Sequence, residues 1–220
     1  MACRPVLVID DHPLVSTALV VALRAEEIDA TRIPVVDRAG ILRAVAQHPP
    51  GLALLDLDLG EAAGCDGLDL ITPLREGGWA VLIVTALRDR RPVAAAIARG
   101  AVGWVSKLES FERLVEVVSA AAAGREVLAP SIREELVLLH QSAHLRREQL
   151  ERGLARLSAR EHLVLTRLAA GHAAAEVAAE FAVSMTTVRA QIRSILVKLD
   201  VRSQLAAVAV LNEAERSGLG

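Results

Sequence analysis

Aromatic side chains and cysteines are scarce in this sequence. Of its 220 residues only 2% are aromatic, and none is tyrosine. Proteins that bind single-stranded nucleic acid stack the bases on aromatic side chains, so this chain is not expected to belong to that class. The two cysteines, Cys3 and Cys65, match neither a metal-binding spacing nor a disulfide framework. Their pattern predicts a protein of a reducing compartment.

Long apolar runs are also missing. No uninterrupted stretch reaches the roughly 18–20 residues of a membrane-spanning helix, and residues 1–5 lead straight into a strand-like run without a leader peptide. We therefore expect a cytoplasmic protein with no membrane partner. Apolar residues still make up 53% of the chain, which is ample for buried cores. The length allows one or two domains of roughly 100–200 residues each.

Neither sign of charge dominates, because the formal net charge is −2. Residues 1–123 have 12 basic and 16 acidic side chains, and residues 124–220 have 13 basic and 11 acidic ones. The sequence therefore predicts an acidic first half and a mildly basic second half, of which the second is the better candidate for a nucleic-acid partner.

The first half alternates between short apolar runs and amphipathic segments. Five such pairs in succession predict an α/β fold with a doubly wound, five-stranded parallel sheet. The expected strands lie near residues 5–10, 30–35, 51–56, 80–85 and 102–105. The expected helices lie near residues 13–26, 38–47, 67–76, 91–99 and 110–123. Between the third strand and its helix, residues 58–67 are expected to form a loose loop.

The second half is expected to be helical throughout. Residues 125–156 predict a charged linker helix, whose heptad pattern is too broken to decide between a solvated connector and a short coiled coil. Four shorter helices follow, near residues 158–170, 174–181, 185–199 and 204–213. The first has the capping-box pattern of Ser158 and Glu161. In the third, Val188, Ile192, Ile195 and Leu199 form one apolar stripe.

Chemically reactive side chains follow four of the predicted strands. Asp10 and Asp11 follow the first strand, Asp56 the third, Thr85 the fourth and Lys107 the fifth. The carboxyl ends of parallel strands meet at one edge of a sheet, where ligands bind. Crowded carboxylates need a cation, and oxygen ligands suit Mg²⁺. A carboxylate beside Mg²⁺ can attack phosphorus, with Lys107 and Thr85 available to the phosphoryl oxygens.

A purely structural reading is also available, because an aspartate at a strand end is often a helix cap. That reading explains any one of these residues well. It does not explain all five on four strand ends, which favours a single phosphoryl-transfer site built around Asp56.

A tight connection and a basic helix predict a helix-turn-helix near residues 174–199. Arg189 and Arg193 lie one turn apart, opposite the apolar stripe, and can reach base edges in the major groove. At the start of the same helix, the hydroxyl groups of Thr186 and Thr187 can contact phosphate oxygens. Lys198 and Arg202 can add charged contacts to phosphate. The alternative, a solvated helix face, is equally consistent with the composition.

The first half of the chain resembles the receiver domain of bacterial response regulators, a flavodoxin-like fold. The resemblance rests on Val6-Leu7-Val8-Ile9-Asp10-Asp11-His12-Pro13, Leu54-Leu55-Asp56-Leu57, Val84-Thr85-Ala86 and Gly100-Ala101-Val102-Gly103-Trp104-Val105-Ser106-Lys107. It implies that a sensor histidine kinase phosphorylates Asp56. It also implies that Mg²⁺ is held by Asp10, Asp11, Asp56 and the backbone carbonyl of Asp58. Thr85 and Lys107 then contact the phosphoryl group, and Thr85 and Trp104 form the switch.

Several positions depart from the receiver pattern. Leu59-Gly60-Glu61 replaces the usual Met-Pro-Gly, Asp66-Gly67 comes about three residues late, and Leu108 replaces a proline. Asp58 adds a carboxylate close to the acceptor. His12 is by itself a candidate metal ligand, but the resemblance makes it an ordinary loop residue, which is the interpretation we prefer at this point.

Residues 157–213 resemble the four-helix LuxR-type DNA-binding domain. The matching segments are Leu157-Ser158-Ala159-Arg160-Glu161, Leu168-Ala169-Ala170-Gly171, Glu176-Val177-Ala178, Val183-Ser184, Thr187-Val188-Arg189 and Ile195-Leu196-Val197-Lys198-Leu199. This resemblance implies base contacts from Arg189, Ala190 and Arg193, and pairing of two subunits on DNA through the last helix. Ala173 stands where a serine usually caps the second helix. Without that side-chain cap the helix loses about 1 kcal/mol of stabilisation.

Together the resemblances imply a response regulator of the NarL/FixJ type. Its expected parts are a receiver domain (1–124), a linker helix (125–156) and a DNA-binding domain (157–220). We expect a non-enzymatic transcription factor that binds double-stranded DNA as a homodimer when Asp56 is phosphorylated. One alternative is a receiver-fold regulator set by a ligand or partner. Another is a phosphatase of the haloacid-dehalogenase type, suggested by Asp56-Leu57-Asp58, but the motif lies on the wrong strand and leaves Asp10 and Asp11 without a role.

Overall fold

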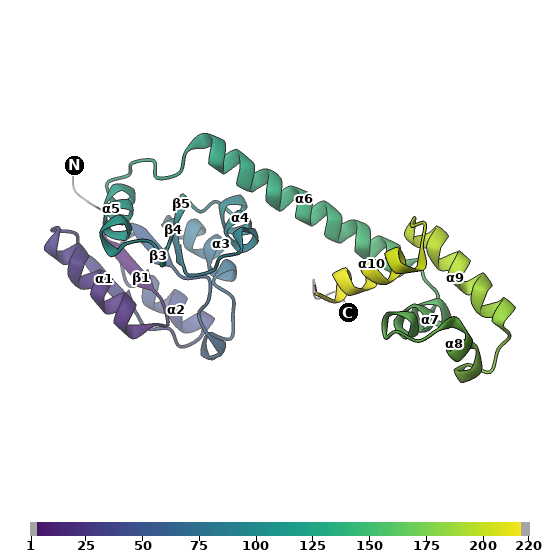
Figure 1. The fold of residues 1–220 in the computed structure, drawn as a ribbon. Coiled ribbons are helices and arrows are strands. Elements are labelled where there is room, and N and C mark those ends of the chain that lie inside the picture. The colour runs from purple at the N-terminus through teal and green to yellow at the C-terminus, as the bar shows by residue number, and fades with distance from the viewer. Residues whose placement is uncertain (1–3, 217–220) are drawn as a thin grey trace. The chain divides into compact units, whose positions relative to one another are not determined.

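The computed structural model describes residues 4–216, apart from the side chains of residues 62 and 216 (Figure 1). Residues up to His140 form one compact unit, and residues from Gln141 onward form a second. Cys65 is a free thiol, whereas Cys3 lies outside the described residues. None of the described helices is long and apolar enough to cross a membrane.

The first unit is built on a five-stranded parallel sheet, as predicted. The strand order is β2-β1-β3-β4-β5, so the chain runs outward from β1 to β2 and then reverses direction across the sheet to reach β3 on the other side of β1. The strands are β1 (Val6–Ile9), β2 (Ala30–Ile33), β3 (Leu52–Leu55), β4 (Ala80–Thr85) and β5 (Gly103–Ser106). The helices between and after them are α1 (Pro13–Ala25), α2 (Arg38–Val45), α3 (Leu68–Glu76), α4 (Arg90–Ala98) and α5 (Phe111–Ala122).

Helices cover both faces of this sheet because alternate strand residues point to opposite sides. Leu7, Ile9 and Leu55 belong to the core beneath α2, α3 and α4. Val8 and Leu54 belong to the core beneath α1 and α5. In Figure 1, α1 and α5 lie on one side of the sheet and α3 and α4 on the other. Burial on both faces explains why the strands read as continuous apolar runs.

The connection from β3 to α3 is more ordered than expected. Residues 58–67 were predicted to be a loose loop, but Glu61–Ala63 form a 3₁₀ turn, η1. The other residues of this segment form a loop, as predicted. Gly60 and Gly64 adopt positive φ angles of 69° and 59°, which set the entry to and exit from the turn. The extra residues of the segment therefore form a defined feature.

Helix α6 (Pro130–Ala155) is a single helix of 26 residues, and each of the two units contains part of it. In the first unit, Leu136 is fully buried in the core that α2, α3 and α4 cover. In the second unit, Leu150 is buried and Arg146 forms an ion pair with Glu213 at 2.7 Å. The linker helix is therefore packed on protein at both ends, and the solvated connector is wrong for these parts of it.

The second unit contains the four predicted short helices. They are α7 (Ala159–Ala169), α8 (Ala174–Glu180), α9 (Met185–Leu199) and α10 (Gln204–Arg216). Their shared core includes Val164, Val177, Val188 and Ile195. At α7 the capping box is complete, since Ser158 Oγ accepts from Glu161 N and Glu161 Oε2 accepts from Ser158 N. At α8 only the glutamate half exists, because Ala173 has no side-chain acceptor.

Candidate functional site

Four strand ends meet at one edge of the sheet, as the sequence predicted. The register places Ile9 beside Leu55 and Leu55 beside Ile83, so the residues that follow these strands are level with one another. Asp10, Asp56 and Thr85 are 4%, 3% and 0% exposed. Such polar groups are buried only at a cost unless they find partners. Their gathering therefore marks a built site.

Lys107 is the partner of two of these acids. Its Nζ lies 2.5 Å from Oδ2 of Asp56 and 2.6 Å from Oδ2 of Asp10. The position of Lys107 is fixed by the backbone, because its N–H donates to the carbonyl of Thr85. The lysine thus comes from the loop after β5 and reaches across β4 to the ends of β1 and β3.

Burial and charge act in opposite directions on the acceptor carboxylate. Burial raises the pKa of Asp56 above its ordinary value, while the hydrogen bond and charge of Lys107 lower it. Burial also disfavours the charged form of Lys107, but hydrogen bonds to Asp10 and Asp56 raise the pKa of its ammonium overall. The lysine therefore stays charged and helps to keep Asp56 ionised, which a nucleophile requires.

The remaining acid, Asp11, lies in the same cluster, where Nδ1 of His12 is 2.7 Å from its Oδ1. One ligand atom each from Asp10, Asp11, His12 and Asp56 lies within 4.8 Å of the others. Oδ1 of Asp11 is buried without a well-aligned hydrogen-bond donor among the described residues. An orphaned carboxylate oxygen among other oxygens fits a divalent cation such as Mg²⁺. The donor set is therefore suited to the expected metal.

Two glycines let the altered loop approach this cluster. A Cβ on Gly67 would lie 2.2 Å from the carbonyl oxygen of Asp56, and a Cβ on Gly60 would lie 2.8 Å from Oδ2 of Asp11. Gly67 comes about three residues later than in the usual receiver pattern, but its backbone still passes close to Asp56. Asp58 donates its backbone N–H to Oδ1 of Asp56 at 3.2 Å.

A cavity of about 370 Å³ opens above the acceptor. It is lined by His12, Val15, Asp56, Asp58, Thr85, Ala86, Leu87 and Lys107. The volume is ample for a phosphoryl group. Asp56, Thr85 and Lys107 therefore face one common space, as their expected roles require.

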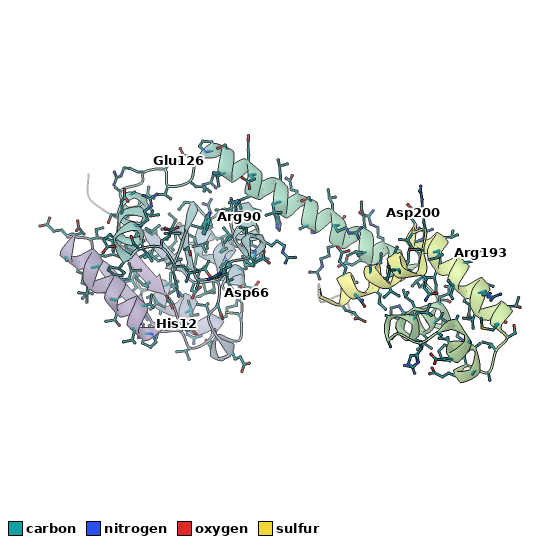
Figure 2. All side chains as sticks on the ribbon, viewed as in Figure 1. His12, Asp66, Arg90, Glu126, Arg193 and Asp200 are labelled. Carbon is teal, nitrogen blue, oxygen red and sulfur yellow. The ribbon has the colours of Figure 1, made fainter. Side chains whose placement is uncertain are left out.

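A second candidate site lies on α9. Ser184 caps this helix through a hydrogen bond from the N–H of Thr187 to its Oγ. The residues expected to face DNA are exposed, namely Thr186, Thr187, Arg189, Ala190, Arg193 and Arg202. Val188 and Ile195 are buried on the opposite side of the helix. Figure 2 shows Arg193 on this helix.

Comparisons with known proteins match both halves of the chain. Residues 6–119 match the response regulator receiver domain, and residues 155–211 match the LuxR family of bacterial regulatory proteins. This chain belongs to the response regulators. Its pairing of a receiver with a LuxR-type domain is that of the NarL/FixJ type, whose members are DNA-binding regulators of transcription rather than a family of catalytic enzymes.

Named relatives share this organisation over nearly the whole length. The probable transcriptional regulatory protein NarL of Mycobacterium tuberculosis is 33% identical over 206 residues, which cover 93% of this chain and 91% of the relative. A nitrate/nitrite response regulator protein homolog of Haemophilus influenzae is 30% identical, covering 96% and 97%. RcsB of Salmonella enterica, solved bound to promoter rprA, has a TM-score of 0.51 at 22% identity, covering 94% and 98%. This last likeness supports the fold alone.

The predicted switch aromatic of the response regulator lies on β5. Trp104 is half-buried and packs against the core that α2, α3, α4 and the first turns of α6 share. Residues before the linker helix also reach this strand, because a Cβ on Gly103 would lie 2.7 Å from a methyl group of Val127. Trp104 faces the core in which Leu136 of α6 is buried, whereas Val127 packs on the opposite face of β5.

One predicted DNA contact has a different partner in this response regulator. Lys198 Nζ lies 2.6 Å from Oε2 of Glu161, and Ser194 Oγ donates to Oε1 of the same carboxylate at 2.6 Å. With Lys198 as the largest cause, these hydrogen bonds lower the pKa of Glu161 to about 2. The contact of Lys198 with DNA phosphate stays a prediction, and its ammonium already pairs with a buried carboxylate.

Proposed function

We propose that this response regulator is a transcription factor whose binding to double-stranded DNA depends on phosphorylation of Asp56 by a sensor histidine kinase. The observation that supports this most strongly is the Asp56 carboxylate, buried at a strand end, paired with Lys107 and facing a cavity. As a regulator of this kind it is not itself an enzyme with a diffusing substrate. The proposed compartment is the cytoplasm.

Asp10, Asp11, Asp56 and the backbone carbonyl of Asp58 would hold Mg²⁺. The ion supplies positive charge that offsets the crowded carboxylates and the incoming phosphoryl oxygens. Asp10 is fixed for this role, since its Oδ1 accepts from the N–H of His12 and its Oδ2 binds Lys107.

Phosphoryl transfer moves one group between two proteins. The N–P bond of the kinase phosphohistidine breaks as a carboxylate oxygen of Asp56 forms a new O–P bond, and the histidine nitrogen keeps the electron pair. Lys107 then shifts its hydrogen bond from Asp56 to a phosphoryl oxygen. Thr85 Oγ1 accepts a hydrogen bond from Leu87 N at 3.3 Å. After the transfer it turns and donates a hydrogen bond to a second phosphoryl oxygen. This reaction depends mainly on the positioning of the reacting groups and on electrostatic stabilisation of the phosphoryl charge.

The movement of Thr85 would free space that Trp104 fills, so these two residues form the switch. The face that changes consists of α4 and β5, and the first turns of α6 lie on it. Arg133 donates to the carbonyls of Ala101 and Val102 at 3.1 and 2.6 Å. The linker helix is thereby in contact with the segment that the switch moves.

The kinase is expected to dock beside the cavity. Leu14 at the start of α1 and Leu108 after Lys107 are 87% and 62% exposed, and Phe111 at the start of α5 is 44% exposed. Leu14 follows the cavity-lining His12 by two residues and Leu108 directly follows Lys107, and exposed apolar side chains in such places suit a protein partner. This surface would bring a phosphohistidine to Asp56.

In the second unit, Arg189, Ala190 and Arg193 would face base edges, and Thr186, Thr187 and Arg202 would face phosphates. Two copies would pair on DNA through α10, on which Leu205 is 80% exposed. The functional division we propose is a receiver domain (1–124), a linker helix (125–156) and a DNA-binding domain (157–220).

The test is to treat the protein with a small phosphodonor and Mg²⁺ and to measure intact mass and oligomer size. We expect one added phosphoryl group per chain, located on Asp56, with a shift from monomer to dimer. Asp56→Asn should show neither change, and Asp66→Asn is the matched control that should behave as wild type. A wild-type chain that stays unlabelled would remove the phosphorylation step.

One observation favours a second candidate, in which a small apolar ligand sets the regulator. A cavity of about 360 Å³ lies beside the altered loop, and it shares Asp58 and Leu87 with the phosphorylation site. Its other lining residues include Leu57, Leu59, Leu68 and Pro92. DNA binding that responds to a small molecule while Asp56 remains unlabelled would favour this candidate.

A further inference from the structure

Three arginines line a cavity at the end of the sheet opposite Asp56. The cavity has a volume of about 480 Å³ and includes the loop that leads into the amino end of β5. Its arginines are Arg75 from α3, Arg125 from the loop between α5 and α6, and Arg133 from the first turns of α6. We propose that this cavity binds a small molecule through a phosphate or pyrophosphate group.

The guanidinium groups of this cavity have no carboxylate partners. Arg75, Arg125 and Arg133 form no ion pair within residues 4–216, whereas the arginines at the start of α4 pair with acids. The carboxylate on the lining belongs to Glu126, and it too is unpaired in the part of the chain that the structure describes. Figure 2 shows Glu126 on the loop that precedes α6. Three positive groups and one negative group leave an excess of positive charge, which a dianion would neutralise.

Backbone contacts position two of these arginines without cancelling their charge. Nη1 of Arg75 donates to the carbonyl of Gly100 at 2.9 Å. Arg133 donates to the carbonyls of Ala101 and Val102 at 3.1 and 2.6 Å. A guanidinium group has five N–H donors, so both arginines keep donors for a ligand. Guanidinium groups fixed in this way are pre-organised for the paired oxygens of a phosphate.

Two glycines of the lining let arginine side chains lie close to the backbone. A Cβ on Gly100 would lie 3.1 Å from Nε of Arg75, and a Cβ on Gly124 would lie 3.8 Å from Nη2 of Arg4. Arg4 precedes β1 and also lacks an ion pair among the described residues. It therefore adds a fourth guanidinium group at the edge of the cavity, from a segment far away in the sequence.

The size and the walls of the cavity suit a small organic phosphate. Sites for small molecules usually have volumes of about 300–1,000 Å³, a range that includes this cavity. A phosphate monoester has a charge of about −1.5 to −2 near pH 7, which matches the excess charge of the lining. Val102 and Val127 add apolar wall for the organic part of the ligand. A bound phosphate would link α3, the loop before β5 and α6, and would thereby strengthen the docking of α6 on the receiver.

The experiment titrates the full chain, labelled with ¹⁵N-glycine, with pyrophosphate at constant ionic strength and without divalent metal. The amide signals of Gly100 and Gly124 should shift to saturation with one common Kd. Those of Gly67, beside Asp56, and of Gly171, in the second unit, should not move. The same result is expected for Asp56→Asn, so this cavity and the phosphorylation site are tested independently. Signals of Gly100 and Gly124 that do not shift would overturn the inference.

Two neighbouring substitutions should have opposite effects on this Kd. The side chain of Arg125 makes no hydrogen bond within residues 4–216, so Arg125→Gln leaves the fold intact, and it should raise the Kd at least about tenfold. Glu126→Gln removes a repelling charge and should lower the Kd about two- to fivefold. The matched control is Arg91→Gln, because Arg91 pairs with Asp89 at the start of α4, and it should leave the Kd unchanged. Equal effects of Arg125→Gln and Arg91→Gln, or a higher Kd for Glu126→Gln, would overturn the inference.

Discussion

The ammonium of Lys198 lies 2.6 Å from a carboxylate oxygen of Glu161 and joins α9 to α7. The chain has one other lysine, Lys107, and it forms the same kind of contact with Asp56. Each lysine therefore pairs with a buried acid, one in each unit. Substituting them one at a time separates the chemistry of the receiver from the stability of the DNA-binding unit.

The Glu161 contact predicts a pH dependence of stability. The folded pKa of Glu161 is about 2, compared with an ordinary value of 4.5. Because the folded pKa is the lower one, the stabilisation is complete above pH 4.5 and is lost as the pH falls toward 2. A carbon-13 titration of this side chain should have its midpoint near 2, and Lys198→Met should raise it. A wild-type midpoint above 4 would refute this assignment.

Substitutions on and just after α9 should separate phosphate contacts from base contacts and structural ones. Arg202→Ala removes a phosphate-facing charge, so the magnitude of the slope of log K against log salt should fall by about 1. Arg193→Ala removes a base contact and should cost about 1–3 kcal/mol of binding at the base pair that it reads. Lys198→Met should leave the salt slope unchanged, because its ammonium binds Glu161. Fluorescence anisotropy with a duplex selected from a random pool measures all three. A reduced slope for Lys198→Met would show instead that Lys198 contacts phosphate.

Lys107→Met should impair phosphorylation through the acceptor itself. The burial that raises the pKa of Asp56 remains, whereas the hydrogen bond and charge that lower it are lost. A larger fraction of Asp56 is then protonated at low pH, and the phosphoryl oxygens lose a cation. We expect labelling by a small phosphodonor to slow about 100-fold and to be slower at pH 6 than at pH 8. Lys198→Met serves as the control and should label at the wild-type rate.

The docking of α6 on the receiver can be tested at Arg133. Arg133→Ala removes two hydrogen bonds from a charged group to the carbonyls that precede β5, a loss of about 1.5–3 kcal/mol each at most. Amide hydrogen exchange over residues 127–137 should therefore accelerate. Arg147→Ala removes only an exposed pair with Glu151 on the same helix and should leave this exchange unchanged. Equal protection in all three proteins would show that Arg133 does not hold the linker.

Much of the fold and the acid site could be predicted from local patterns. Apolar runs predict strands, and Asp10, Asp56 and Lys107 directly follow such runs. The parallel register then brings these residues together. The pair of Glu161 and Lys198 could not be found this way, because its members are 37 residues apart and the capping box already explained Glu161.

Local sequence patterns also fail to predict how the linker helix packs and how the altered loop of residues 58–67 is shaped. The apolar spacing of α6 predicts a helix but not the surface on which Leu136 is buried. The η1 turn depends on positive φ angles at Gly60 and Gly64, which glycine permits but does not require. The position of His12 beside Asp11 follows from the backbone contacts of its loop, which no periodicity reports.

The central claim is that phosphorylation of Asp56 controls the DNA-binding unit. The most direct measurement compares DNA affinity of wild type and Asp56→Asn, each with and without a small phosphodonor in Mg²⁺. We predict that the phosphodonor changes the affinity of wild type at least tenfold, an effect of about 1.4 kcal/mol, and leaves Asp56→Asn unaffected. Four identical binding curves would contradict the account.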